Sequence, residues 1–356
     1  MSSGSASGPG STSKGSAASA AAAALRDRRE LTPAEIGGFM SELMAGRLPT
    51  AEVIEVLELL RAKGETAREI TEAARVMRAN GIRVNTGLPR VLDTCGTGGD
   101  GSCTVSVSTI VALIAAAAGV PVAKHGNRSA SSKWGSADFL SEIGIPIETE
   151  ADRLVQGLKE TNFAFFYARS FHPSMKHAAE ARKEIKGRTI FNCIGPLTNP
   201  AGATHQLVGV NEERLVPLMA EALGALGAVH AIVVHSNDGI DEVSPTAFAQ
   251  VAEWTKGRLI RWKPFNSEEA GVKRLTGGRD LLKSADIAAA VREGLSIIDG
   301  APGPKTELVV LNAGFALKAA DEAVSISEGV EMARNLLSSG SVRKKMDQIK
   351  AFYGKN

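Results

Sequence analysis

The chain has little cysteine, few aromatic residues and no long uninterrupted apolar run. Its three cysteines, Cys95, Cys103 and Cys193, are odd in number and widely spaced, which excludes a disulfide framework and a zinc-binding pattern. Aromatic residues form only 4% of the sequence, so stacking platforms for nucleic acid are not expected. The longest apolar stretch, residues 110–123, is broken by a glycine and a proline and is shorter than the roughly 20 residues of a membrane span. We predict a buried helix followed by a strand there, and no membrane association.

The charges of the chain are nearly balanced. Its 356 residues include 41 Lys and Arg against 39 Asp and Glu, which gives a net charge of +2. Proteins that bind nucleic acid usually carry a strong basic patch, so no nucleic acid partner is expected. Hydrophobic residues form 44% of the chain, enough for the core of a globular protein with roughly two domains. Glycine is abundant, with 37 residues, and favours ligand loops lined by backbone.

The first 30 residues are rich in Ser, Ala and Gly. Such a segment cannot bury enough apolar surface to offset its chain entropy, so we predict that residues 1–30 form a disordered low-complexity tail. The alternative is a cleaved organelle-targeting segment, because the stretch is rich in serine and has no acidic residue before Asp27. Its few arginines favour a dispensable tail. We therefore expect the protein in the cytoplasm, or in a plastid if the segment is a targeting peptide.

Residues 31–88 indicate a small helical bundle. A Thr-Pro-Ala-Glu sequence that begins at Thr32 is typical of a helix start with a reciprocal cap. We expect Thr50 to cap a second helix that ends at Gly64. A third helix is expected over about residues 66–80, because its apolar residues repeat with helical spacing and a glycine follows.

From residue 90 onward, short β-branched runs alternate with helical stretches. This alternation predicts an α/β domain in which a mostly parallel central sheet is flanked by helices. We expect strands at residues 90–93, 120–123, 208–210, 230–234 and 308–311, and helices at residues 106–118 and 212–226.

A glycine-rich segment, residues 93–101, lies between the first strand and a helix expected to open at Thr104. Glycines let backbone N–H groups converge on a ligand, and a helix N-terminus adds unpaired donors and partial positive charge. The hydroxyls of Thr104, Ser108 and Thr109 in the expected first turn add further donors. The segment therefore predicts an anion site, with phosphate as the ligand.

Two other interpretations of this segment fit less well. Gly96-x-Gly98-x-x-Gly101 satisfies the dinucleotide fingerprint, but a dinucleotide site also needs an acidic residue about 20 residues further on. The next strand ends in Lys124 and His125 instead, and a lysine suits a phosphate better than a ribose diol. A tight turn without a ligand is the second alternative, which the clustered glycines and hydroxyls disfavour.

A second polar segment, residues 124–132, follows the next strand and combines lysine, arginine, amide and serine side chains. Because the carboxyl ends of neighbouring parallel strands meet at one crevice, the two segments should face each other. Together they suggest a substrate with two separate phosphate groups.

Two adjacent carboxylates, Asp241 and Glu242, follow a further strand. A surface turn with incidental acids is the simpler interpretation of such a pair. Beside a polyphosphate site, however, adjacent carboxylates favour Mg²⁺, which binds one or two carboxylates together with phosphate oxygens and water.

At these motifs the sequence resembles the anthranilate phosphoribosyltransferase family. The matching segments are residues 96–100 (GTGGD), 124–128 (KHGNR), 188–192 (RTIFN), 195–200 (GPLTNP) and the Asp241-Glu242 pair. The resemblance covers about residues 31–350. It implies that phosphoribosyl pyrophosphate (PRPP) and anthranilate give phosphoribosylanthranilate and pyrophosphate, a reaction of tryptophan biosynthesis, with two Mg²⁺ ions per subunit.

The resemblance also implies an architecture. A helical domain would comprise residues 31–88 plus about 169–190, and two subunits would form a homodimer through it. An α/β domain that binds PRPP would comprise residues 89–168 plus 191–356.

Roles of individual residues follow from the same resemblance. PRPP contacts are implied for Gly96, Gly99, Asp100, Thr104, Ser106, Ser108, Thr109, Lys124, His125, Gly126, Asn127, Arg128, Ser129, Ala130, Ser131, Ser132 and Ser136. Anthranilate contacts are implied for Gly96, Asn127, Arg182, Gly195 and Pro196. Metal ligation is implied for Ser108, Asp241 and Glu242, and a catalytic role for Lys124, Asp241 and Glu242. For Arg182 the alternative is an exposed helix charge, since its neighbours look like ordinary surface.

The chain departs from the family pattern at three positions. Ser106 stands where asparagine is usual, Trp134 where a small residue is common, and Ser236 where glycine is frequent. None of these departures removes a charge or a metal ligand. They bear on substrate affinity rather than on the type of reaction.

The six scattered histidines form no nucleophile–base pair. Departure of pyrophosphate mainly requires neutralisation of its charge and positioning of the attacking amine. Two rival classes agree less well with the motifs. A pyrimidine nucleoside phosphorylase should lack the KHGNR segment and the acidic pair, and a nucleic-acid-binding relative should show a basic stripe.

Overall fold

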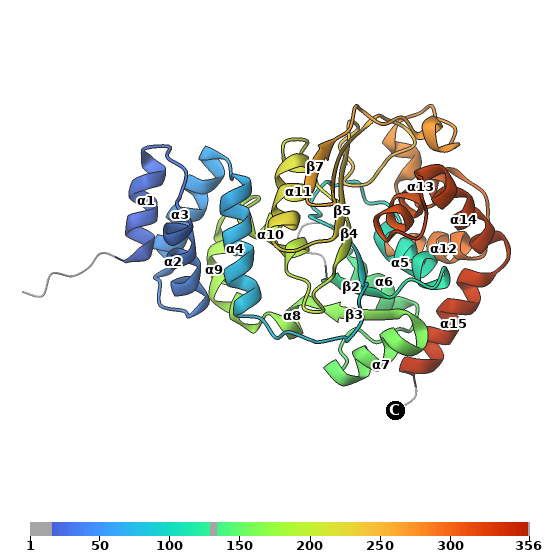
Figure 1. Cartoon of the computed structure of the whole chain (residues 1–356), viewed down its shortest axis with the longest axis horizontal. Coiled ribbons are helices and arrows are strands. Elements are labelled where there is room, and N and C mark those ends of the chain that lie inside the picture. The colour runs from blue at the N-terminus through green and yellow to red at the C-terminus, as the bar shows by residue number, and fades with distance from the viewer. Residues whose placement is uncertain (1–15, 129–133, 355–356) are drawn as a thin grey trace, which may run out of the picture.

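The computed structural model describes residues 16–128 and 134–354. They form a helical part and an α/β part that lie side by side along the longest axis of the molecule (Figure 1). Nowhere in these two stretches is a helix long and apolar enough to span a bilayer. The apolar run at residues 110–123 divides between helix α5 (Val107–Ala117) and strand β2 (Val122–Gly126), as predicted.

The helical part is built mainly from the beginning of the chain. Its helices are α1 (Ala17–Arg26), α2 (Pro33–Met44), α3 (Thr50–Lys63) and α4 (Ala67–Ala79). A segment from the middle of the chain joins them through α8 (Ala168–Phe171), the 3-10 helix η1 (Pro173–Ala178) and α9 (Ala179–Glu184). Of these, η1 contacts α2 and α9 contacts α3.

Local caps explain where two of these helices begin. The Thr32 hydroxyl accepts a hydrogen bond from the Glu35 N–H, and the Glu35 carboxylate accepts one from the Thr32 N–H. Thr66 and Glu69 repeat this reciprocal arrangement at the start of α4. Both pairs satisfy backbone donors that a helix start otherwise leaves unpaired, so the helix starts near residues 32 and 66 are confirmed.

The prediction of a disordered tail over residues 1–30 is wrong for its second half. Residues 17–26 form helix α1, and Ala18, Ala21, Ala22 and Leu25 are buried in the helical core. Alanine has the highest helix propensity, and its small side chain lets α1 lie close to α2 and α3. Burial against these neighbours therefore orders a stretch whose composition alone suggested a tail. Residues 1–15 lie outside the described residues.

Thr50 does not cap α3, contrary to prediction. Pro49 occupies the cap position, and Thr50 is the first helical residue. Its hydroxyl donates to the carboxylate of Glu180 in α9 at 2.9 Å. Gly64 ends the helix with a positive φ of 87°, as predicted.

Seven strands of the described residues pair in one sheet of order β3-β2-β1-β4-β5-β6-β7. Strands β1 to β5 are parallel, and β6 and β7 form an antiparallel hairpin at one edge. The mostly parallel sheet is therefore confirmed. The remaining strand bounds are β1 (Leu92–Gly96), β3 (Phe163–Tyr167), β4 (His205–Gly209), β5 (His230–Ser236), β6 (Ala249–Thr255) and β7 (Arg258–Arg261).

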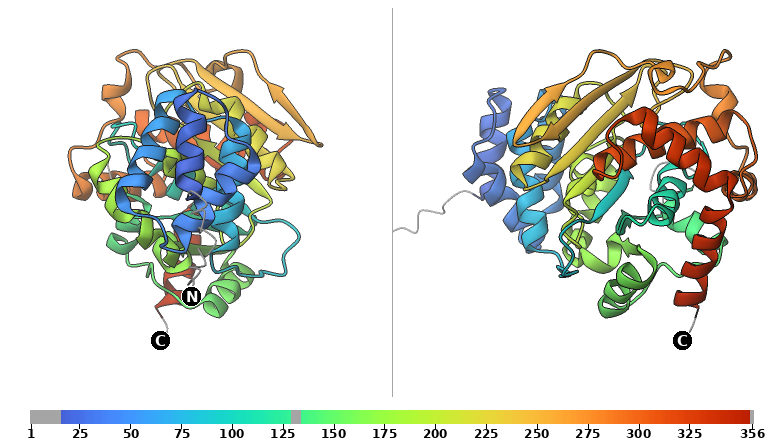
Figure 2. Two further views of the ribbon diagram at one scale, coloured as in Figure 1. Left: turned by 90° about the vertical axis from the view of Figure 1, so that its left-hand side faces the viewer. Right: turned by 45° about the vertical axis from the view of Figure 1, so that its right-hand side comes forward.

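Helices cover both faces of the sheet (Figures 1 and 2). The α4 and α11 side and the α5 and α13 side hold separate apolar cores, and β5 contributes alternate residues to each: Ala231 and Val233 to one, Ile232 and Val234 to the other. The remaining elements are α6 (Ser136–Glu142), α7 (Ala151–Thr161), α10 (Ile190–Ile194), η2 (Gly195–Leu197), α11 (Leu215–Ala225), η3 (Ser267–Ala270), η4 (Arg279–Leu282), α12 (Ile287–Ile298), α13 (Pro304–Ala319), α14 (Ile326–Ser338) and α15 (Ser341–Tyr353).

Three further predictions need correction. Residues 308–311 belong to α13 rather than to a strand, because a short apolar run also suits a helix that is buried on all sides. Helix α5 begins at Val107, so Thr104 precedes it and forms a bridge with Lys283 instead. Strand β2 extends to Gly126, which makes the first residues of the second polar segment part of the sheet rather than of a loop.

Candidate active site

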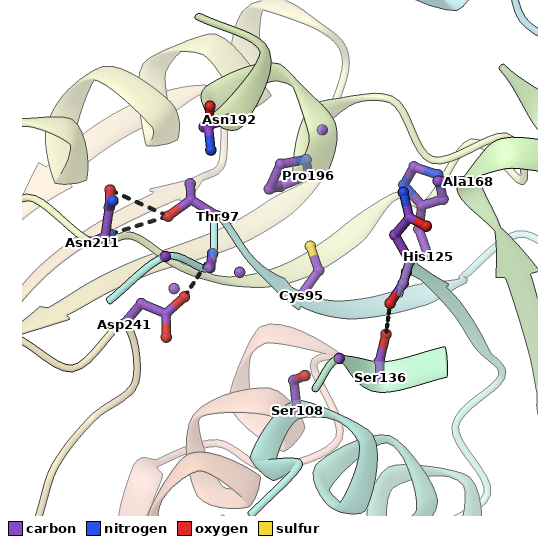
Figure 3. A pocket seen from close by; sticks show the side chains of 18 of the residues that line it. Cys95, Thr97, Ser108, His125, Ser136, Ala168, Asn192, Pro196, Asn211 and Asp241 are labelled. Carbon is purple, nitrogen blue, oxygen red and sulfur yellow. Dashed lines mark hydrogen bonds between the residues drawn. The ribbon is translucent and has the colours of Figure 1, made fainter. Parts of the chain in front are cut away.

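The predicted site residues meet at the carboxyl edge of the sheet. A cavity of about 1290 Å³ opens there, and Figure 3 shows Thr97, Ser108, His125 and Asp241 around it. Every predicted site residue that the structure describes lines this cavity: Gly96, Gly99, Asp100, Thr104, Ser106, Ser108, Thr109, Lys124, His125, Gly126, Asn127, Arg128, Ser136, Arg182, Gly195, Pro196, Asp241 and Glu242. Ser129, Ala130, Ser131 and Ser132 lie outside the described residues.

Glycines shape the wall formed by β1 and β4. Gly98 and Gly99 have φ angles of 62° and 79°, which other residues rarely adopt. A Cβ atom on Gly96 would lie 2.7 Å from the carboxylate of Asp241, and one on Gly209 would lie 1.5 Å from the Asp241 carbonyl oxygen. Glycine at these two strand ends therefore lets the acidic turn reach the glycine-rich segment.

Lys124 is a buried strand residue beneath this wall, with 1% exposure. Its Nζ donates to the Thr94 carbonyl at 2.6 Å and to the Ser108 hydroxyl at 3.1 Å. Burial lowers the pKa of Lys124, while the charge of Asp93 raises it. These bonds hold the ammonium group between β1 and the start of α5.

An acidic cluster stands beside the glycine-rich segment. Asp100, Asp241 and Glu242 each offer a carboxylate oxygen within 4.8 Å of the others. Asp241 accepts a hydrogen bond from the Gly98 N–H at 3.0 Å, whereas the buried Glu242 Oε2 has no hydrogen-bond partner among the described residues. Burial, and then the charge of Asp100, raise the pKa of Asp241 to about 8. Burial and the charge of Asp241 raise the pKa of Glu242 well above its usual range.

This donor set fits a divalent cation. Carboxylates that repel one another, with one buried oxygen unpaired, are stabilised when a hard cation supplies positive charge and takes oxygen ligands. Asp100, which was predicted only as a PRPP contact, completes the carboxylate group. Ser108, predicted as a ligand, accepts its hydrogen bond from Lys124.

Arg182 lies on α9, across the cavity from the sheet elements. The guanidinium packs over the ring of Phe191 at 5.5 Å from its centroid and makes no hydrogen bond or ion pair within the described residues. Burial lowers the pKa of Arg182. Arg182 is therefore half-buried rather than fully exposed, and it has no acidic partner among the described residues. An arginine in this state can pair with an anionic ligand.

Two neutral histidines form another part of the lining. The rings of His125 and His172 meet edge to face, with centroids 5.4 Å apart. Burial lowers the pKa of both, that of His125 to about 3. His125 Nε2 and His172 Nδ1 are buried and have no hydrogen-bond partner in the described part of the chain. Each ring therefore has one nitrogen beside the cavity that makes no hydrogen bond there.

Two buried polar residues that support the site went unpredicted. The carboxylate of Asp93 accepts hydrogen bonds from the His125 N–H at 3.1 Å and from the Asn199 amide at 2.8 Å. The same amide also donates to the Ala123 carbonyl at 2.7 Å, so Asn199 ties β1 to β2. The available signal was a charged residue within a β-branched strand and an asparagine within the GPLTNP segment.

Trp134, one of the departures from the family pattern, joins the two polar segments. Its indole Nε1 donates to the Thr104 carbonyl at 3.2 Å, and its side chain is buried. The link fixes the residues that follow β2 against those that precede α5.

Comparison with known protein families first defines a class. The helical bundle domain of a glycosyl transferase family matches residues 20–81, and the a/b domain of a glycosyl transferase family matches residues 88–343. The first match begins within α1, in keeping with its place in the helical core. With a glycine-rich segment and an acidic cluster at the sheet's carboxyl edge, these matches define a two-domain glycosyltransferase.

Individual relatives narrow this class to one family. The chain is 43% identical over 328 residues to the anthranilate phosphoribosyltransferase of Symbiobacterium thermophilum, covering 92% of this chain and 95% of the relative. It is 42% identical over 333 residues to the one of Thioalkalivibrio sulfidiphilus, covering 92% and 96%. The crystal structure of the enzyme from Thermus thermophilus matches with a TM-score of 0.87 and 38% identity, covering 94% and 99%. This chain belongs to the anthranilate phosphoribosyltransferase family.

A more distant likeness extends the agreement in fold. The anthranilate phosphoribosyltransferase of Saccharomyces cerevisiae, in a structure in complex with PRPP and Mg, is 22% identical and has a TM-score of 0.85. It covers 95% of this chain and 98% of its own.

Proposed function

We infer that this protein transfers the phosphoribosyl group of PRPP to the amino group of anthranilate and releases pyrophosphate, a step of tryptophan biosynthesis. The observation that carries this inference is the lining of one cavity. It combines glycine and hydroxyl donors, a buried lysine, an acidic cluster and an arginine without an acidic partner. These groups match the phosphates, the divalent cation and the carboxylate that the reaction brings together.

The PRPP phosphates bind between the glycine-rich segment and the start of α5. Within the described residues, no side chain caps α5 and the buried Thr109 hydroxyl has no hydrogen-bond partner. The N–H groups of Val107 and Thr109 already donate to the Val105 and Ser106 carbonyls, so the Ser108 N–H is the first-turn donor available to an anion. Lys124 supplies a fixed positive charge beneath them. The other proposed contacts are Gly96, Gly99, Asp100, Thr104, Ser106, Ser108, His125, Gly126, Asn127, Arg128 and Ser136, with Ser129, Ala130, Ser131 and Ser132 beyond the described residues.

Asp241 and Glu242, joined by Asp100, would hold Mg²⁺. The number of two ions per subunit and the ligation by Ser108 remain part of this proposal. When bound, Mg²⁺ neutralises the negative charge that grows on the departing pyrophosphate. Lys124 and the backbone donors stabilise the same negative charge. They need no rearrangement to do so, because they already lie at the site before the reaction begins.

Anthranilate binds on the α9 side of the cavity. The Arg182 guanidinium pairs with its carboxylate, and Asn127, Gly96, Gly195 and Pro196 complete the pocket. Holding the amine beside the anomeric carbon lets the enzyme work largely by positioning. No nucleophilic side chain is required.

Assembly and location complete the proposal. We expect a homodimer formed through the helical part and a cytoplasmic enzyme. Sedimentation and fractionation measure the two properties directly.

Loss of anthranilate fluorescence on mixing with PRPP tests the function. Fluorescence should fall in the presence of Mg²⁺ and persist when EDTA is added. Phosphorolysis of pyrimidine nucleosides, measured in parallel, should be absent. Stable anthranilate fluorescence under all conditions, with nucleoside cleavage instead, would replace the proposed reaction by that of a phosphorylase.

A further inference from the structure

The acidic turn, residues 237–244, carries both adjacent carboxylates but contains no helix or strand. It is buried at Val243 and Ser244, and buried backbone N–H and C=O groups require partners. Two polar side chains from outside the turn provide them: Asn312 of α13 and Ser236, the last residue of β5.

The Asn312 side chain hydrogen-bonds to both backbone groups of one turn residue, Val243. Its Oδ1 accepts from the Val243 N–H and its Nδ2 donates to the Val243 carbonyl, each at 2.9 Å. A third bond, from Nδ2 to the Leu308 carbonyl at 2.8 Å, anchors the amide to its own helix. Asn312 is 2% exposed and has fully buried apolar neighbours along α13. A buried amide is costly unless it is fully bonded, so this one has a specific task.

Ser236 holds the residues on either side of Val243. Its hydroxyl donates to the Glu242 carbonyl at 2.7 Å and accepts from the Ser244 N–H at 2.8 Å. With Asn312, it fixes four backbone groups over residues 242–244.

The turn needs such support because its own charges oppose its conformation. Asp100, Asp241 and Glu242 each place a carboxylate oxygen within 4.8 Å of the others, and like charges this close together repel one another when no cation is bound. Bonds to backbone groups can resist this repulsion without occupying the carboxylate oxygens. In the part of the chain that the structure describes, Glu242 Oε2 makes no hydrogen bond.

We propose that Asn312 and Ser236 are positioning residues that hold the acidic turn in the conformation that binds a divalent cation. The proposal rests on the metal assignment made above for Asp241 and Glu242. Asn312 borders the cavity, but both side chains bond to backbone groups of the turn rather than to its carboxylate oxygens. They act through the Glu242 carbonyl and the backbone of the two residues that follow it, Val243 and Ser244.

Binding of Mn²⁺ to the substrate-free enzyme tests the proposal. Asn312→Leu removes the amide, and we expect Mn²⁺, followed by electron paramagnetic resonance, to bind about 10- to 100-fold more weakly, the range typical for loss of a group that orients metal ligands. The Mg²⁺ concentration for half-maximal activity should rise in parallel, while the KM for anthranilate stays unchanged. Ser236→Ala, a smaller change, should weaken Mn²⁺ binding in the same direction and serves alone if Asn312→Leu does not fold.

Two further variants separate the possible causes. Thr306→Val also removes a buried hydrogen bond from α13, that of its hydroxyl to the Ala301 carbonyl at 2.6 Å, and should lower the melting temperature without changing Mn²⁺ affinity. Asp241→Asn tests the metal assignment itself: if it leaves Mn²⁺ binding intact, the assignment fails. If Asp241→Asn abolishes binding while Asn312→Leu and Ser236→Ala match the wild type, only the positioning proposal is overturned. A wild-type enzyme that binds no Mn²⁺ without substrate also overturns it, since a preorganised turn must hold the ion alone.

Discussion

The two edges of the central sheet arrange their charged side chains in opposite ways. At the amino edge, His230 lies between two carboxylates, with Nδ1 2.7 Å from Asp321 and Nε2 2.8 Å from Glu253. At the carboxyl edge, Asp241 and Glu242 lie beside a third carboxylate. The amino edge thus contains a histidine paired with carboxylates, whereas the carboxyl edge contains carboxylates held close to one another.

Further contacts complete the network at the amino edge. The second oxygen of Glu253 accepts from the Trp262 indole at 3.0 Å, and Lys318 approaches its first oxygen at 3.4 Å. His205 reaches Asp321 at 3.3 Å. An unpaired buried charge is destabilising, whereas a paired one can be tolerated. The paired charges at the amino edge therefore stabilise the fold. The clustered carboxylates at the carboxyl edge destabilise it until a ligand neutralises their charge.

The largest effect should come from removing the charges at the carboxyl edge. In the double variant Asp241→Asn, Glu242→Gln, Mg²⁺-dependent turnover should fall by more than about 10³-fold, since one preset electrostatic contact typically contributes 10²–10³. The melting temperature should stay equal or rise, because repulsion is relieved. Kinetics and thermal unfolding measure the two properties.

Asp321→Asn provides the matched control at the amino edge. Asp321 has a φ of 54°, a conformation that asparagine tolerates, so the variant reports on charge alone. It should lower the melting temperature and leave turnover unchanged. Full activity in the double variant Asp241→Asn, Glu242→Gln would contradict the claim that the carboxylates at the carboxyl edge are needed for turnover.

Arg182, unlike His230, is a basic side chain that has no acidic partner among the described residues. Arg182→Ala should raise the KM for anthranilate by about 10- to 100-fold, because a hydrogen bond to a charged group contributes about 1.5–3 kcal/mol. The KM for PRPP should change little. Lys186→Ala, at an exposed position that is not part of the cavity lining, is the control and should leave both constants unchanged. Equal KM values for anthranilate in the wild type and Arg182→Ala would show that Arg182 does not bind this substrate.

At the amino edge, stability should depend on pH through His230. Burial by itself lowers the pKa of His230, but hydrogen bonds and charges from Glu253 and Asp321 outweigh burial, so its pKa is raised. Its contribution is therefore fully present below the unfolded pKa of about 6.5 and is lost as pH rises through the higher folded pKa. The free energy of unfolding of the wild type should exceed that of His230→Gln most near pH 6.

The expected difference is on the order of 1 kcal/mol, and urea titrations at pH 6, 7.5 and 9 would follow its decline. His205, whose pKa burial lowers, is retained in both proteins and so affects both alike. A difference that grows toward pH 9 would contradict a protonated His230 in the folded state.

The smallest effects should come from two indole hydrogen bonds, one near each edge. Trp134→Phe removes the bond to the Thr104 carbonyl and should raise the KM for PRPP a few-fold, since a neutral hydrogen bond contributes about 0.5–1.5 kcal/mol. Trp262→Phe removes the bond to Glu253 and should lower the melting temperature without altering that KM. Identical responses of the two variants would show that neither bond is specific to its edge.

Much of the architecture followed from local patterns. The reciprocal cap at Thr32, the helix start near residue 66, the stop at Gly64 and the alternation of strands and helices were all predicted from the sequence. The errors lie where packing overrides composition. The alanine-rich residues 17–26 are helical because neighbouring helices bury them, and residues 308–311 lie in a helix that is covered on every side.

The site was largely predictable as a set of residues but not as an arrangement. Glycines, lysine and the acidic pair stand in recognisable motifs at strand ends. The absence of an acidic partner for Arg182 depends on what lies around α9. The place of Asp100 within the acidic cluster depends on how the glycine segment folds back.

Short-range chemistry along the chain was sufficient to specify the caps, the helix stops, the strand-to-helix alternation and the motifs that gather the ligand groups. The buried bonds of Asn312 to the acidic turn and the packing of α1 needed the folded molecule. The reason is physical: a cap joins residues three apart, whereas Asn312 and Val243 come together only when α13 packs against the sheet. Sequence patterns report the first kind of contact directly and contain little trace of the second.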